Sequence, residues 1–100
     1  MTIHTEQIDT ATTALHLEGR LDTTTFPALE SALQEIPETV LTVILDFAQL
    51  TYISSAGLRT ILSTQKKMNA RHGSLILRHV SENIMEVFEL TGFDSFLTIE

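Results

Sequence analysis

The chain has 100 residues, of which 43% are hydrophobic, so we expect a single folded domain spanning residues 1–100 with a packed core. Its 13 acidic and 6 basic residues give a formal net charge of −7, which disfavours binding to nucleic acid or to an anionic membrane surface. There is no cysteine, no signal-peptide pattern and no apolar run long enough to span a bilayer. We therefore expect a cytoplasmic protein without a disulfide, a thiol nucleophile or a membrane-inserted segment.

The first third of the chain predicts two strands and a helix. Residues 3–8 form a weak strand candidate with apolar residues only at its ends, whereas residues 14–18 alternate well between apolar and polar. Residues 19–25 are rich in helix-capping side chains, and Pro27, which is tolerated in the first turn of a helix, follows them. Apolar residues then recur at helical spacing, so we expect an amphipathic helix that ends near Pro37.

The middle of the chain predicts the central strand of the sheet and a second helix. Residues 40–45 are nearly all apolar or β-branched, which is typical of a strand buried on both faces. We expect this strand to end at residues 46–47 and residues 48–55 to form a loop. Apolar residues from Leu58 onwards mark one face of the second helix, and Gly73 is placed to end it as a C-cap.

The last part of the chain predicts one more strand and one more helix. Residues 75–77 form the strand, Ser81 can cap the helix, and Gly92 can end it. Residues 96–99 either add a short strand or pack on the core as a tail. The element order is therefore β-β-α-β-α-β-α, with or without a closing strand. This order predicts an α/β fold in which three helices pack on a mixed sheet of four to five strands.

Two serines stand where the central strand leads into the second helix. Ser54 and Ser55 are followed by Gly57, which falls inside the first turn of that helix. Either serine fits a simple N-cap, because its hydroxyl accepts hydrogen bonds from free backbone N–H groups. Gly57 is unusual there, since glycine costs roughly 1 kcal/mol relative to alanine within a helix. One candidate for the compensation is the close approach of another backbone to a face that lacks a Cβ.

A phosphate would be tolerated at this helix start. Free N–H groups and the positive end of the helix dipole both favour an anion there. A phosphoserine would add about −1.5 to −2 charges at pH 7 on an exposed face. The domain would stay folded, and a docked partner would experience repulsion. The segment therefore has a suitable geometry for a switch.

Two motifs resemble the STAS-domain family of anti-sigma factor antagonists. In that family a strand ends in Asp and a hydrophobic residue, and a short loop leads to a phosphoacceptor serine or threonine, a small residue, Gly and Leu. Residues 46–47 and 55–58 match this pattern, and residues 19–22 match the Gly-x-Leu-Asp that precedes the first helix in the family. The element order agrees over essentially the whole chain. One position departs, because Ser54 stands where well-known antagonists have Asp.

The resemblance implies a binding protein that acts as a switch and not an enzyme. Members of the family bind an anti-sigma factor that is also a serine kinase, and phosphorylation of the antagonist breaks this complex. A metal-dependent serine phosphatase restores binding, and sigma-factor-dependent transcription is regulated in this way. The mechanism needs only a monomer and no cofactor or bound metal. Ser55 would be phosphorylated, with Ser54 as the second candidate, and the implied partner-binding residues are Asp22, Thr23, Asp46, Ser54, Ser55, Ala56, Gly57 and Leu58.

Three of these residues also fit purely structural roles. Asp22 can cap the first helix, and Asp46 can end its strand by accepting hydrogen bonds from loop N–H groups. Leu58 lies on the apolar stripe of the second helix, where a core residue is expected.

One other function fits the sequence, whereas an enzymatic one does not. Some lone STAS domains serve as constitutive subunits of membrane lipid-transport ATPase complexes, and Ser54 in place of Asp leaves that role open. A serine hydrolase is disfavoured, because the nucleophile motif Gly-x-Ser-x-Gly would need a glycine where Ile53 stands. There is no Gly-rich phosphate loop, and no metal-ligand spacing on one helix face is found among the histidines, His4, His16, His72 and His79.

Overall fold

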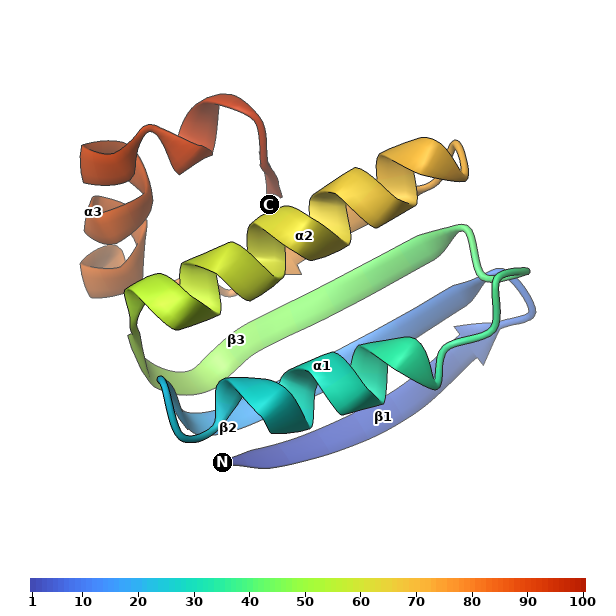
Figure 1. Ribbon diagram of the computed structural model, residues 1–100, viewed down its shortest axis with the longest axis horizontal. Coiled ribbons are helices and arrows are strands. Elements are labelled where there is room, and N and C mark those ends of the chain that lie inside the picture. The colour runs from blue at the N-terminus through green and yellow to red at the C-terminus, as the bar shows by residue number, and fades with distance from the viewer.

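The computed structural model describes all 100 residues and shows a five-stranded sheet with helices packed against it (Figure 1). β1 pairs antiparallel with β2, and all other neighbouring strands are parallel. The predicted mixed sheet of four to five strands is therefore confirmed. The strands follow one another across the sheet in chain order: β1 (Thr2–Asp9), β2 (Thr12–Leu21), β3 (Thr42–Ile53), β4 (Ser74–Arg78) and β5 (Thr98–Ile99).

Three helices accompany the sheet, as predicted. α1 (Phe26–Gln34) and α2 (Ser55–Ala70) lie side by side over one face, and α3 (Glu82–Thr91) lies near the end of β3, followed by a 3₁₀ turn at Phe93–Ser95 (Figure 1). The predicted caps of α3 are confirmed, because the Ser81 hydroxyl accepts from the Ile84 N–H at 3.3 Å and Gly92 has a φ of 78°. None of the helices combines the length and the apolar character that a membrane-spanning helix requires.

The core lies between the sheet and the helices. Leu15, Leu45 and Leu77 stand side by side on β2, β3 and β4, and each is fully buried. Burying a leucine side chain contributes about 1.5–3 kcal/mol, so this row anchors the three central strands. Val43 and Ile44, on opposite faces of β3, are only 2% and 6% exposed, which confirms a central strand buried on both sides.

β3 is longer than its sequence pattern indicated. We expected residues 48–55 to form a loop, but the strand continues to Ile53 and pairs with β2 as far as Leu21. The pairing shifts register twice, after His16 and after Gly19, and at each shift β3 supplies one extra residue. Such bulges interrupt the two-residue alternation of apolar and polar side chains by which a strand is recognised. The second half of β3 is therefore not evident from the sequence.

The end of α2 also differs from expectation. The helix stops at Ala70, and His72, with a φ of 58°, takes the left-handed conformation that we assigned to Gly73. Gly73 is required for a different reason: a Cβ there would lie 2.5 Å from the carbonyl oxygen of Leu41.

Candidate functional site

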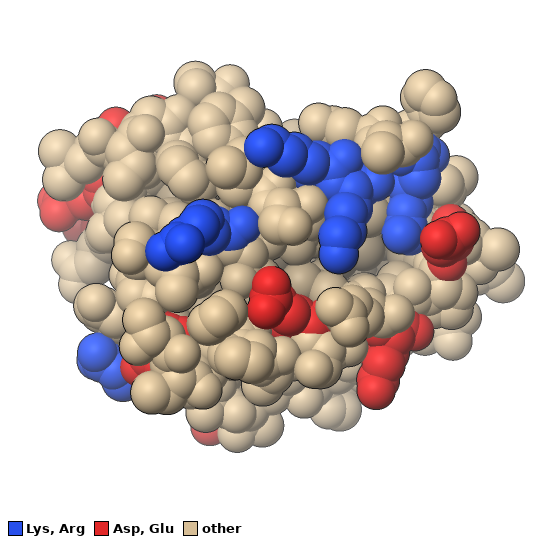
Figure 2. Space-filling view, viewed as in Figure 1, with Lys and Arg blue, Asp and Glu red and all other residues tan.

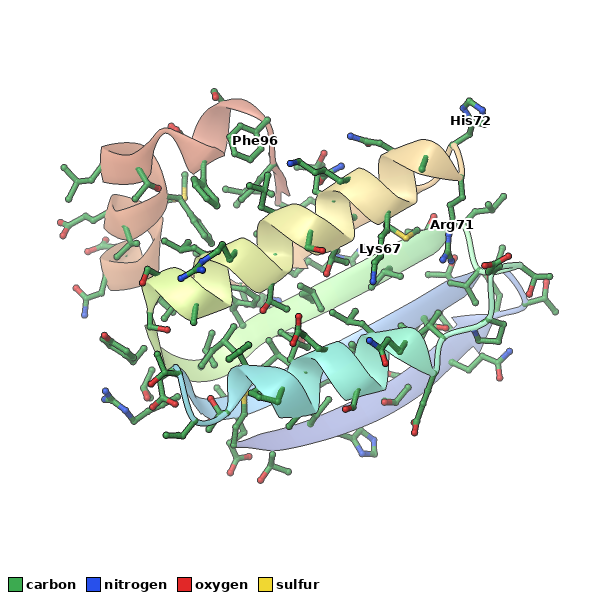
Figure 3. The ribbon with its side chains drawn as sticks, in the orientation of Figure 1. Lys67, Arg71, His72 and Phe96 are labelled. Atoms are coloured by element: carbon green, nitrogen blue, oxygen red, sulfur yellow. The ribbon has the colours of Figure 1, made fainter.

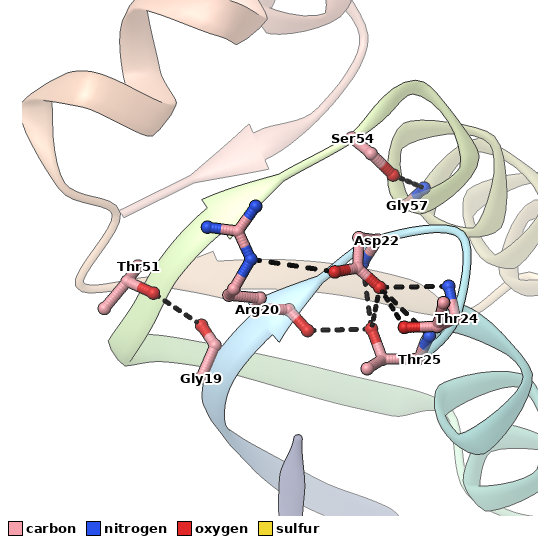
Figure 4. Close-up of polar contacts among 8 residues, drawn as sticks. All are labelled: Gly19, Arg20, Asp22, Thr24, Thr25, Thr51, Ser54 and Gly57. Atoms are coloured by element: carbon pink, nitrogen blue, oxygen red, sulfur yellow. Dashed lines mark hydrogen bonds and ion pairs between the residues drawn. The ribbon is translucent and has the colours of Figure 1, made fainter.

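Ser54 and Ser55 have different roles at the start of α2. Ser54 is the N-cap, and its Oγ accepts a hydrogen bond from the Gly57 N–H at 3.3 Å (Figure 4). Ser55 is the first helical residue, is exposed, and makes no side-chain hydrogen bond within the protein. The hydroxyl of Ser55 is therefore free for modification, while Ser54 keeps the helix start in place.

Gly57 is in close contact with its neighbours at this helix start, but not with the other backbone that we considered as a candidate. A Cβ at this position would lie 2.8 Å from Leu21 Cγ and 2.9 Å from Ile53 Cγ1. The neighbours are side chains of the protein itself and not another backbone. Gly57 and Leu58 are buried, and Leu58 belongs to the core cluster. Both residues therefore fix the position of α2 and offer little surface to a partner.

Asp22 organises the turn between β2 and α1. Its Oδ1 accepts hydrogen bonds from the Thr24 hydroxyl at 2.8 Å, the Thr24 N–H at 3.0 Å and the Thr25 N–H at 3.2 Å (Figure 4). These bonds, above all the one from the Thr24 hydroxyl, lower the pKa of Asp22 below its ordinary value. The N-cap of α1 is Thr25, so Asp22 supports the turn before the helix without being its cap residue.

The turn and the start of α2 are joined by backbone hydrogen bonds. The Ser54 N–H donates to the Leu21 carbonyl at 2.9 Å, one residue before Asp22. A second link lies nearby, where the Thr51 hydroxyl donates to the Gly19 carbonyl at 3.0 Å (Figure 4). The predicted residues Asp22, Ser54 and Gly57 therefore belong to one connected site.

Two surface residues of this site were not anticipated. The Arg20 guanidinium lies 4.1 Å from the centroid of the Tyr52 ring, and Arg20 Nε lies 3.6 Å from Asp22 Oδ2. Tyr52 remains 40% exposed. The two residues meet because Arg20 pairs with Tyr52 after the second register shift of β2 and β3, which the sequence pattern does not reveal. They provide an aromatic and cationic surface at the ends of β2 and β3, next to Asp22.

Asp46, which the family resemblance groups with Ser55 as a partner-binding residue, does not lie beside Ser55 in the structure. It sits within β3, and a strand rises about 3.3 Å per residue, so roughly 20 Å of strand separates it from Ile53. Its carboxylate instead joins two histidines. Oδ2 lies 3.0 Å from His16 Nδ1, and Oδ1 lies 2.9 Å from His79 Nδ1.

The histidine cluster around Asp46 perturbs two pKa values. Burial raises the pKa of Asp46, but the Ala48 N–H and the two histidines outweigh this effect, so the net pKa is lowered. The pKa of His16 is raised, chiefly by the Glu6 carboxylate, whose Oε1 lies 2.8 Å from His16 Nε2. No group of three or more His, Cys, Asp or Glu residues is arranged to hold a metal ion.

The STAS domain family model matches residues 2–100. The chain therefore belongs to the STAS domain family. It is 42% identical over 57 residues to a putative anti-sigma factor antagonist, BtrV, of Bordetella bronchiseptica. That match covers 57% of this chain and 49% of BtrV, so it spans about half of that relative. The anti-sigma-B factor antagonist of Listeria monocytogenes is 26% identical over 102 residues, which cover 100% of this chain and 89% of that protein.

A solved structure supports the same fold. The unphosphorylated form of the anti-sigma factor antagonist SpoIIAA superposes with a TM-score of 0.76 at 21% identity, covering 99% of this chain and 87% of SpoIIAA. The phosphorylated form of SpoIIAA, from Bacillus, superposes with a TM-score of 0.70 at 22% identity, covering 99% of this chain and 91% of that one. At this level of identity the likeness shows the fold.

Proposed function

We propose that this protein is an anti-sigma factor antagonist that binds a kinase-type anti-sigma factor and is released from it when Ser55 is phosphorylated. The observation that carries the proposal is the exposed, unbonded hydroxyl of Ser55 beside a neighbour, Ser54, that is occupied as the helix cap. The names of the Bordetella and Listeria relatives support the antagonist role. SpoIIAA, which shares the fold, exists in unphosphorylated and phosphorylated forms.

The local structure suits a switch that leaves its own domain intact. A phosphate on Ser55 would meet the free N–H groups and the positive dipole end of α2, while the Ser54 cap and the Gly57 contact stay unchanged. The added charge, about −1.5 to −2 at pH 7, would act on a docked partner through repulsion and desolvation. Ser55, Thr23, Arg20 and Tyr52 are the exposed residues that such a partner would touch. The role requires no catalytic residue or cofactor of this chain, and we expect it to be exerted in the cytoplasm.

The first experiment is phosphosite mapping by mass spectrometry. The protein is isolated from its own cells, and its bound partners are identified in the same sample. Phosphate on Ser55 together with a bound ATPase-type serine kinase is the expected result, and a serine phosphatase is the expected second partner. An unmodified chain bound to a lipid-transport ATPase would instead assign the protein to the constitutive-subunit role.

Substitutions at Ser55 then test the switch directly. We expect Ser55→Ala to keep full affinity for the anti-sigma factor and Ser55→Asp to weaken it at least tenfold in calorimetric titration. Ser31→Asp, at an exposed serine on α1, provides the charge-matched control and should bind like the unchanged protein. Equal affinities of Ser55→Asp and Ser31→Asp would refute the proposal.

A further inference from the structure

Positive charge is concentrated on one helix. Of the six Lys and Arg residues of the chain, Arg59, Lys66 and Lys67 lie on α2 and Arg71 is its C-cap. No Asp or Glu lies on α2, although the chain as a whole carries a net charge of −7. Lys and Arg side chains accordingly form a row along α2, with acidic side chains across from them on the α1 side (Figure 2). This row is a local exception to the acidic surface.

The charges of the row are not neutralised within the protein. Every ion pair in the structure involves Arg20, Arg78 or a histidine. Arg71 donates hydrogen bonds to the backbone carbonyls of Pro37 and Val40, so it also holds the loop between α1 and β3 in place. Arg59, Lys66 and Lys67 are exposed and have no carboxylate partner. They are available to a carboxylate from outside the chain.

A groove runs between α1 and α2 beneath this row. The part of the groove towards the N-terminal ends of the two helices has a volume of about 590 Å³, with Arg59 and Lys66 on the α2 wall, Glu30 on the α1 wall, and Phe26 and Leu62 as apolar lining. Thr23 and Ala56 also line it, so the groove opens directly beside Ser55. Further along, Lys67 and Arg71 project from α2 towards α1 (Figure 3).

We infer that this groove is a docking site for an acidic, amphipathic segment of a partner protein. The apolar lining at Phe26 and Leu62 would receive an apolar anchor, while carboxylates of the segment would pair with Arg59 and Lys66. Glu30 on the opposite wall would repel carboxylates, so the segment would lie with its acidic face towards α2. The partially shielded groove makes such pairs more favourable than pairs in open water.

A protein segment fits this surface better than a polyanion does. A nucleic acid or an anionic membrane presents a dense array of negative charge to the whole face, including Glu30, and meets a chain of net charge −7. A peptide can place a few carboxylates against a few cations and put apolar side chains against Phe26 and Leu62. The combination of a short basic wall, an acidic opposite wall and an apolar lining therefore favours a protein ligand.

The groove is also coupled to the proposed switch through Arg59. This residue follows Ser55 by four positions, the spacing at which side chains on a helix meet. A phosphate on Ser55 would compete with a docked carboxylate for the Arg59 guanidinium and would weaken docking. Docking to the unmodified chain does not depend on phosphorylation, so the two proposals can fail separately.

The test is a titration of the ¹⁵N-labelled protein with a synthetic peptide, followed by NMR. The peptide is a capped helix-forming sequence of about 15 residues with leucines on one face and glutamates on the other, and the control peptide carries glutamine in place of glutamate. We expect saturable shifts of amides on both walls, from residues 23–34 and 56–71, with the glutamate peptide alone. The dissociation constant should rise about tenfold between 50 and 200 mM salt, as charge-driven binding does.

Protein variants place the interaction on the groove. The double variant Arg59→Gln/Lys66→Gln should weaken binding of the glutamate peptide at least fivefold. Arg78→Gln, on the opposite face of the sheet and paired with Glu100, should leave it unchanged. Thermal melts of all variants confirm that each is folded. Ser55→Asp should weaken peptide binding by a smaller factor, through Arg59.

Three outcomes would overturn the inference: the absence of saturable shifts in the groove, equal binding of the glutamine peptide, or an unchanged affinity of the double variant. Parallel titrations with a duplex oligonucleotide and with phosphatidylglycerol vesicles test the other anions. If either shifts the same amides at lower concentration than the peptide, the groove is a polyanion surface and not a peptide site. None of these results bears on whether Ser55 is phosphorylated, which is settled by the mass-spectrometric experiment.

Discussion

Gly57 and Leu21 are in such close contact that a Cβ on Gly57 would come within 2.8 Å of Leu21 Cγ. The Leu21 carbonyl also accepts the Ser54 N–H, so the end of β2 and the start of α2 form one unit. Ser55 is the next residue after Ser54 in the chain. Its side chain is exposed to solvent, while these contacts hold the neighbouring backbone in place. The glycine that seemed costly in a helix is therefore explained by packing.

Replacement of Gly57 by alanine should destabilise the protein. Overpacking of a core costs about 1–3 kcal/mol, and the better helix propensity of alanine offsets about 1 kcal/mol of this. We expect a net loss of up to about 2 kcal/mol in the free energy of unfolding, measured by urea denaturation. Ser63→Ala, at an exposed position of the same helix, should be neutral or slightly stabilising. A Gly57→Ala protein more stable than the unchanged protein would show that Leu21 and Ile53 yield easily.

The two serines should differ in their effect on stability. Ser54→Ala removes the hydroxyl that caps α2, and loss of such a cap costs about 1 kcal/mol. Ser55→Ala removes a hydroxyl with no partner, so the free energy of unfolding should change by less than about 0.5 kcal/mol. Urea denaturation of both variants gives the comparison. The reverse order would make Ser55 the cap and Ser54 the free hydroxyl.

Local signals predicted much of this molecule. The Ser81 cap and the αL residue Gly92 each depend on side chains within a few positions, and each is confirmed. The buried strand predicted at residues 40–45 is confirmed only from Thr42 onwards, because Leu41 lies before the strand and is 45% exposed. The bulges that extend β3 to Ile53 could not be predicted, because they result from pairing with β2. His72 likewise takes the left-handed conformation expected of a neighbouring glycine, since Gly73 is needed for contact with Leu41.

The candidate site was predictable in its centre and not at its edges. Ser55 and Gly57 belong to a contiguous motif, so their positions follow from the start of one helix. The placing of Asp46 failed, because the strand after it is longer than expected, and the contacts of Asp46 with His16 and His79 span 30 and 33 positions of the chain. Such contacts are set by the parallel register of β2, β3 and β4 and leave no local pattern.

Asp22 should govern the order of the turn before α1. Replacing it with alanine removes the acceptor of the Thr24 and Thr25 N–H bonds. We expect the Thr24 and Thr25 amides to exchange with deuterium at least several times faster, while amides of β3 keep their protection. The bonds to Asp22 hold its pKa low, so the same loosening should occur in the unchanged protein as the pH falls through the pKa of the folded state. Unchanged exchange in Asp22→Ala would assign the turn to its backbone bonds alone.

His16 should make stability depend on pH near neutrality. The Glu6 carboxylate, with a further contribution from Asp46, raises the pKa of His16 above its model-peptide value of 6.5. A raised pKa in the folded state means that protonation stabilises the fold, fully so below the unfolded pKa, and that this contribution is lost as the pH rises through the folded pKa. The His16 side chain is 39% exposed, so solvent screening limits the effect to about 0.2–1 kcal/mol.

The measurement compares His16→Gln with the unchanged protein in urea at pH 5.5 and at pH 8.5. The difference in the free energy of unfolding between the unchanged protein and the variant should favour the unchanged protein more strongly at pH 5.5 than at pH 8.5. His72→Gln, at an exposed histidine that forms no ion pair, is the matched control. Asp46 acts in the opposite range, because its lowered pKa gives stability that is lost only as the pH falls below about 4. A difference that grows with pH would mean that His16 is held neutral in the folded protein, and the pairing with Glu6 would then not be ionic.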